Sequence, residues 1–305
     1  MTPLPRPDPP RGGRDALAHP PWTAVLRSTY ARAKADRVNV AAGAFAYRWF
    51  LSIFPGVIAL LGLTTIFRVP HGVVVNLIHG VTRSLPVGAA QVFTTAILNA
   101  SRRSGHDLAA TVVASVVALW SATSGMVIVE EGLDMALGLA SDRSQWAKRA
   151  LALPLLAGGA LLGGVASALV IFGPQLGVLV AHGAPFGGAA FATAWTVLRW
   201  LLGLVLMNLM VSLLYYLAPN RTRGCWRWAS RGTVLATVLW ALVSLGFSFY
   251  TSNFRSFGAT YGAFAGVAIL IFWLYLTGLA ILLGAELDAA LARQATSRDG
   301  GAQPA

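Results

Sequence analysis

Two long uncharged runs near the C-terminus constrain the fold more than any other feature of this sequence. The first extends from Gly232 to Phe254, and a second run follows and ends at Ala285. A short polar, glycine-containing stretch, Ser252–Gly262, separates them. Each run supplies about the 20 apolar residues that a helix needs to cross ~30 Å of hydrocarbon. The sequence therefore predicts a membrane hairpin here.

The composition extends this interpretation to the whole chain. Of its 305 residues, 56% are hydrophobic and only 11% are charged, whereas soluble domains carry about 25% charged residues. We therefore predict an all-α, polytopic membrane protein with six transmembrane helices. The first four spans are expected at Val40–Phe67, at Leu108–Val129, and on either side of a break near residues 182–188, with the fourth ending near Leu217.

The segments outside the spans divide the chain into three parts. Residues 1–39 form a basic leader that we expect to be partly disordered, with an amphipathic surface helix at Trp22–Arg37. Residues 40–290 form the membrane domain, and residues 291–305 form a polar tail. Between spans 1 and 2, Arg68–Asp107 is only moderately hydrophobic and is expected to form interfacial helices.

The distribution of lysine and arginine predicts the orientation. With the N-terminus inside, the inner segments hold 16 of these residues and the outer segments hold 5. The positive-inside rule then places both termini in the cytoplasm. The net charge of +12 is explained by such topogenic arginines, so we expect no nucleic-acid partner.

Several short motifs carry a family resemblance that covers almost the whole chain. They are Ala46-Tyr47, Leu51–Pro55, Leu119–Ala122, Leu214–Asn220, Ala259–Gly262, Trp273–Tyr275 and Leu283–Leu287. Together they resemble the YihY/BrkB family of bacterial inner-membrane proteins, formerly labelled ribonuclease BN-like. The resemblance implies a helical fold and an inner-membrane location, but no substrate.

Signatures of catalysis are sparse. The five histidines lie at least eight positions apart, and none shares a motif with a nearby acid. A metal-dependent nuclease needs clustered nitrogen and carboxylate ligands to hold its ion. No phosphate-binding loop of the Gly-x-x-x-x-Gly-Lys type is present. We therefore expect no catalytic residues, no metal and no cofactor.

A charged residue within a span is the clearer functional candidate, because its burial in lipid costs free energy. Arg48 lies eight residues into span 1. One interpretation is that its side chain extends to the cytoplasmic headgroups; another is a structural ion pair. The interpretation we test is that Arg48 faces a central cavity close to an acid, most plausibly Glu286.

Other polar residues lie at the ends of spans. Glu130 and Glu286 are expected to be solvated helix ends, or alternatively to have a structural role or line a substrate path, and these alternatives carry more weight for Glu286, which belongs to the motif Leu283–Leu287. Arg199 should extend outward or pair with a neighbouring span. Three residues at the outer turn either cap the two helices or line a vestibule: Asn253, Thr260 and Tyr261.

These features favour a transporter or exporter that is not driven by ATP and moves an amphiphilic or anionic substrate, such as a lipid. The alternative is a membrane scaffold or envelope-integrity factor that transports nothing. A ribonuclease or another enzyme is the least favoured class. The expected partners are membrane lipids and a small or lipid substrate. A sealed cavity lined by Arg48 would favour transport, and a solid core would favour the scaffold.

The orientation leads to a direct test at Cys225, the one cysteine of the chain. Because Cys225 lies in the basic segment between spans 4 and 5, a membrane-impermeant thiol reagent should not label it in intact cells. Labelling should appear once the cells are permeabilised. Ready labelling of intact cells would contradict the predicted topology.

Overall fold

The computed structural model describes residues 22–66, 72, 108–139, 143–183, 189–220, 226–253 and 255–299. In these ranges all regular structure is helical, which confirms the predicted class. The helices are α1 (Trp22–Ala35), α2 (Val38–Ile66), α5 (Leu108–Leu137), α6 (Gln145–Gly183), α7 (Ala189–Leu217), α8 (Arg231–Asn253) and α9 (Arg255–Asp299).

Five of these helices contain stretches long and apolar enough to cross a membrane. The stretches are Ser115–Leu137, Gln145–Ala166, Phe191–Leu217, Arg231–Tyr250 and Gly266–Gln294. α2 coincides with the expected first span, but its side chains from residue 53 onward lie outside the described part, as do the leader before Trp22 and most of the connector. The sixth span, the disorder of the leader and the interfacial connector helices therefore stay predictions.

Helices α5 and α9 are longer than the sequence suggested. α5 continues beyond Val129 to Leu137, so Glu130 is inside the helix and not at its end. α9 begins at Arg255, so Thr260 and Tyr261 belong to this helix and not to the expected turn. Helix continuation at polar residues has a physical cause, because in a membrane each backbone N–H and C=O must find its partner within the segment.

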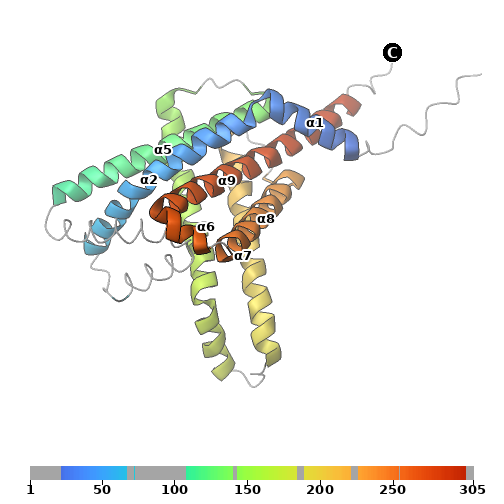
Figure 1. The fold of residues 1–305 in the computed structure, drawn as a ribbon. Coiled ribbons are helices and arrows are strands. Elements are labelled where there is room, and N and C mark those ends of the chain that lie inside the picture. The colour runs from blue at the N-terminus through green and yellow to red at the C-terminus, as the bar shows by residue number, and fades with distance from the viewer. Residues whose placement is uncertain are drawn as a thin grey trace, which may run out of the picture.

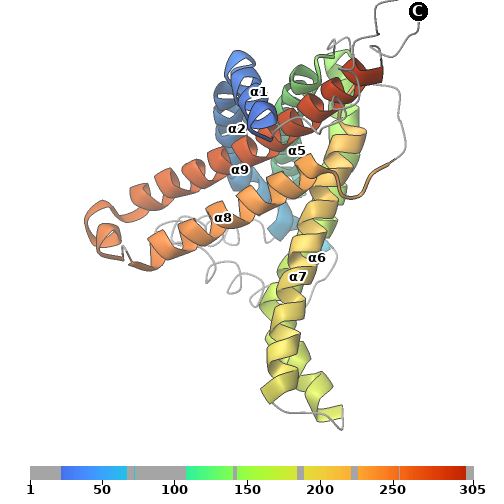
Figure 2. The same cartoon turned by 90° about the vertical axis from the view of Figure 1, so that its right-hand side faces the viewer.

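The long helices form two groups that meet at one end. Figures 1 and 2 show α2, α5, α8 and α9 side by side, while the α6–α7 hairpin diverges from them. The two groups come together near α1, the start of α6, the start of α8 and the end of α9 (Figure 2). We call this region the convergent end. α1 lies across α9 there, and Ala33 of α1 and Val38 at the start of α2 form a buried cluster with Leu282 of α9.

Small residues form much of the core at the convergent end. Alanines from four of the long helices, and one just after α7, are almost completely buried: Ala136, Ala152, Ala218, Ala236 and Ala285. Lipid tails are as apolar as leucine, so helix association in a membrane depends on close packing rather than on the hydrophobic effect. Alanine at the contacts allows the backbones to approach each other, which explains why the helices meet here.

The closest backbone approach joins α8 to α9. A Cβ atom added to Gly232 would collide with the carbonyl oxygen of Gly284, and a Cβ added to Gly284 would collide with that of Gly232. The same crossing brings Asp288 of α9 to the first turn of α8. Its Oδ1 accepts a hydrogen bond from the N–H of Gly232 at 2.7 Å, and its Oδ2 accepts one from the hydroxyl of Ser230.

This crossing predicts a sharp difference between two glycine substitutions. Gly284→Ala should lower the Tm of the purified protein, since overpacking of a tight contact costs about 1–3 kcal/mol. Gly246→Ala is the matched control on α8, because nothing lies within 4 Å of an added Cβ there. Thermal unfolding in detergent measures both. Equal Tm values for the two variants would contradict the close packing at Gly284.

Candidate functional site

A cavity of about 720 Å³ lies between the two groups of helices. Every long helix contributes to its wall, from α2 through α9. The wall is largely apolar and includes Phe45, Leu119, Met126, Leu155, Met207 and Trp273. Its size is typical of ligand sites, which enclose about 300–1,000 Å³. This cavity is the first part of the candidate site.

Glycines of α6 help to open the cavity. Gly159 and Gly163 both line it, and nothing lies within 4 Å of a Cβ added to Gly163. The Gly-x-x-x-Gly spacing of this pair is typical of a face that packs against another helix. Here the missing side chain at Gly163 leaves space instead, so the pair enlarges the cavity.

Few polar atoms face the cavity. The side chains of Trp49, Ser52 and Thr277 belong to its wall. Ser52 donates its hydroxyl to the carbonyl of Trp49 at 2.7 Å, while the indole of Trp49 lies against Gly125, which has no room for a Cβ. Thr277 Oγ1 is buried without a hydrogen-bond partner. The cavity can therefore accept an apolar group, and its described wall includes two polar groups without a hydrogen-bond partner, the hydroxyl of Thr277 and the indole N–H of Trp49.

Arg48 does not belong to this wall among the described residues, although its neighbour Trp49 does. Phe45, Trp49 and Ser52 form the cavity side of α2, at helical spacing. Arg48 lies on the exposed side, as does Tyr47. The expectation that Arg48 faces the cavity is therefore wrong, because this arginine lies outside the arc of α2 that the other helices cover.

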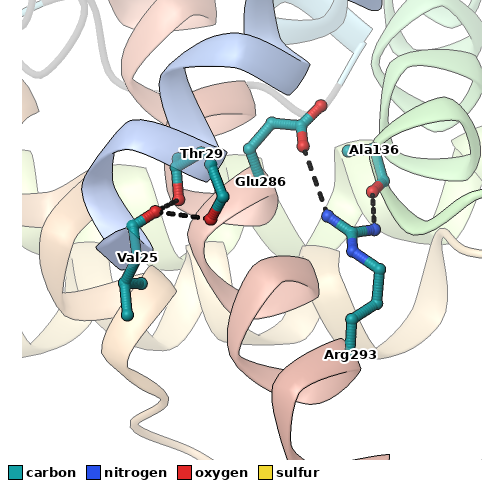
Figure 3. Close-up of polar contacts among 6 residues, drawn as sticks. Val25, Thr29, Ala136, Glu286 and Arg293 are labelled. Carbon is teal, nitrogen blue, oxygen red and sulfur yellow. Dashed lines mark hydrogen bonds and ion pairs between the residues drawn. The ribbon is translucent and has the colours of Figure 1, made fainter. Parts of the chain in front are cut away.

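The second part of the candidate site is a set of buried charges at the convergent end. Glu286 of α9 is fully buried, and its carboxylate lies 3.9 Å from the guanidinium of Arg293 (Figure 3). Arg293 also donates to the carbonyl of Ala136 at 3.3 Å, which connects α9 to α5. Asp36 and Arg32 are further charged neighbours of Glu286. Glu286 is thus neither a solvated helix end nor the partner of Arg48, so both of these expectations are wrong. Its partner is Arg293, which lies two turns along the same helix.

Glu130 of α5 is also buried, with 1% of its surface exposed. Neither of its carboxylate oxygens has a hydrogen-bond partner. Its charged neighbours are Arg143, Asp134, Lys148 and Glu131, but Lys148 pairs with Glu131 at 2.6 Å. The expected solvated helix end is wrong here too, because α6 and the convergent core cover this part of α5.

Two charges that the sequence analysis did not single out hold the Leu214–Asn220 motif in place. Asp134 accepts a hydrogen bond from the N–H of Asn220 at 2.7 Å. Arg143 donates to the carbonyls of Ala218 at 2.8 Å and Pro219 at 3.3 Å. The signal in the sequence was the spacing of Glu130 and Asp134, which are four apart and therefore share one face of a helix.

The remaining candidate residues lie elsewhere. The stem of Arg199 lies against Gly173 of the neighbouring helix α6, where Trp195 also donates to the carbonyl of Gly173 at 2.6 Å. Asn253 is the last residue of α8, and Thr260 and Tyr261 lie early in α9. The side chains of Asn253, Thr260 and Tyr261 are outside the described part, so their roles as caps or vestibule residues stay predictions.

Comparison with known proteins identifies the family. The family model described as "Virulence factor BrkB" matches residues 29–305. The chain belongs to the BrkB family. A Bacillus subtilis relative, the ribonuclease-like protein YfkH, is 33% identical over 81% of this chain and 87% of its own. UPF0761 membrane proteins of Alteromonas mediterranea and Vibrio vulnificus are 28% and 29% identical, over 85% and 88% of this chain and 85% and 82% of theirs. No solved structure matches.

Membership of the BrkB family makes this chain a multi-pass helical membrane protein. This is a family of membrane proteins and not a known enzyme family, so the ribonuclease-like name of one relative is a legacy label. Within the described residues, no three His, Cys, Asp or Glu side chains form a group that could hold a metal ion. The side chains of all five histidines lie outside that part. The absence of ribonuclease activity therefore stays a prediction.

The two buried acids of α5 predict opposite effects on stability. Asp134→Ala removes the acceptor of the hydrogen bond from the N–H of Asn220 and should cost about 1–3 kcal/mol, which thermal unfolding would show as a lower Tm. Glu130→Gln removes a buried charge and no hydrogen bond, so its Tm should be equal to or above that of the parent. A Glu130→Gln variant as unstable as Asp134→Ala would show that Glu130 has a structural partner.

Proposed function

We propose that this BrkB family member transports a lipid-like amphiphile across the bacterial inner membrane without hydrolysing ATP. The cavity between the two helix groups carries the proposal. A non-transporting scaffold has no need of a space of about 720 Å³ at the centre of its spans. The hollow centre thus favours transport over the scaffold alternative.

The chemistry of the wall favours a hydrocarbon chain as the bound group. Among the described residues that line the cavity, none is charged, and most are aliphatic or aromatic. A small hydrophilic anion would lose its hydration there without gaining a cation or several donors, which is unfavourable. An acyl chain loses no hydrogen bonds on entry. We therefore narrow the expected substrate from an amphiphile or anion to an amphiphile.

The helix arrangement suggests which side is closed. Buried alanines and Tyr215, whose hydroxyl donates to the carbonyl of Ile281, hold the helices together at the convergent end. The α6–α7 hairpin diverges from the other helices away from that end (Figure 2). With both termini in the cytoplasm, as the positive-inside rule predicts, the convergent end closes the cavity toward the cytoplasm.

A filled cavity should abolish transport. We expect Gly163→Trp to place an indole in the cavity, because the space beside Gly163 is empty. The adjacent Gly164→Trp is the matched control, since Gly164 is exposed and does not line the cavity among the described residues. In proteoliposomes containing a fluorescent-headgroup phospholipid, the parent and Gly164→Trp should move the lipid between leaflets, and Gly163→Trp should not.

Two outcomes of the same vesicle assay would contradict the proposed function. Lipid movement no faster than in protein-free vesicles, for a parent protein that unfolds at its usual Tm, would favour the scaffold. Undiminished movement in Gly163→Trp would show that the substrate does not pass through this cavity.

A further inference from the structure

A second, separate pocket of about 440 Å³ lies at the convergent end, between α5, the end of α7, the start of α8 and α9. It shares no residue with the apolar cavity. Its wall combines leucines with polar and cationic side chains, including Tyr216, Trp226, Arg227, Ser230, Arg231 and Asp288. A pocket of this mixed chemistry needs a different ligand from the apolar cavity.

The charge in this pocket favours an anion. Arg227 and Arg231 both line it and are exposed. Asp288 is the single acid in the described wall, and its two oxygens already accept hydrogen bonds from Gly232 and Ser230. The carboxylate is thus engaged by the first turn of α8, whereas the two guanidinium groups can bind phosphate oxygens in a forked geometry.

The surroundings place the pocket at the level of lipid headgroups. Trp226 lines the pocket and is about half exposed, and Trp228, two residues further along the chain, is also exposed. The guanidinium of Arg231 lies 5.4 Å from the ring centre of Trp22. α1 continues this surface with two further exposed apolar side chains at helical spacing, Leu26 and Tyr30. Tryptophan and tyrosine concentrate at the boundary between hydrocarbon and water, where their rings are amphipathic.

We propose that this pocket binds the phosphate-bearing headgroup of an anionic phospholipid from the leaflet at the convergent end. Arg227 and Arg231 bind the phosphate, the hydroxyl of Ser230 lies in the same wall, and the exposed indoles cover the glycerol region. Basic pockets between membrane helices at the cytoplasmic side are suited to such headgroups. Lipid binding at this pocket does not depend on transport through the cavity, so the proposal also holds if the protein is a scaffold.

Lipid binding can be measured by native mass spectrometry of the full-length protein, exchanged into detergent with phosphatidylglycerol or phosphatidylcholine. The parent should bind one phosphatidylglycerol in preference to phosphatidylcholine. Arg227→Ala with Arg231→Ala should weaken this binding about 30-fold, from the attraction of two arginines near the surface. Arg48→Ala, which removes an exposed arginine outside the pocket, should bind as the parent does.

Two further arms make the result decisive. Arg227→Lys with Arg231→Lys preserves the charge and should retain at least part of the preference, which separates lost binding from lost folding if the alanine variant unfolds at a lower Tm. Glycerol phosphate supplies the headgroup without acyl chains and should compete poorly. Competition by glycerol phosphate as strong as by phosphatidylglycerol would overturn the proposal, and so would equal binding of both lipids or an equal loss in Arg48→Ala.

Discussion

The close contact of α8 and α9 at Gly232 and Gly284 is the interaction on which the rest of the described structure depends. Because neither residue has a Cβ, the two backbones meet, and Asp288 accepts a hydrogen bond from the N–H of Gly232 in the first turn of α8. Gly284 also gives Tyr215 space to donate to the carbonyl of Ile281. One glycine pair therefore joins α7, α8 and α9 at the same end of the molecule.

Side-chain size differs between this end and the cavity. Where the contacts are alanine and glycine, helices approach closely, whereas beside the cavity the large side chains of Trp240 and Trp273 meet in an edge-to-face pair between α8 and α9. Both indoles line the cavity. The spacing of these two tryptophans along the chain does not show what lies between them.

The sequence predicted what depends on local composition. The start of α8 at Arg231, the end of α7 at Leu217 and the break after α6 follow from hydrophobic length and from charges. The sequence-based predictions were wrong where contacts with other helices, and not water, surround a charged side chain. Glu130 and Glu286 looked like solvated ends because charges usually seek water, but Arg143, Arg293 and their neighbours surround them inside the protein. The contact of α2 with α9, through Ala42 and Phe45 at Gly278, likewise leaves no trace in either segment alone.

Charged residues within membrane helices are often taken as functional, but here the buried charges lie at the convergent end and the apolar cavity lies elsewhere. Charged side chains bind backbone groups at the end of α7 and at the start of α8: Arg143 and Asp134 at the first, and Asp288 at the second. Arg293 links Glu286 to α5. Buried charges that remain in a membrane need such partners, so their presence at the convergent end is explained by structure. The described residues that line the cavity are uncharged, so a search for function among charged residues alone would not find it. For the proposed transport of a lipid-like amphiphile, the informative feature is this apolar space between the helices.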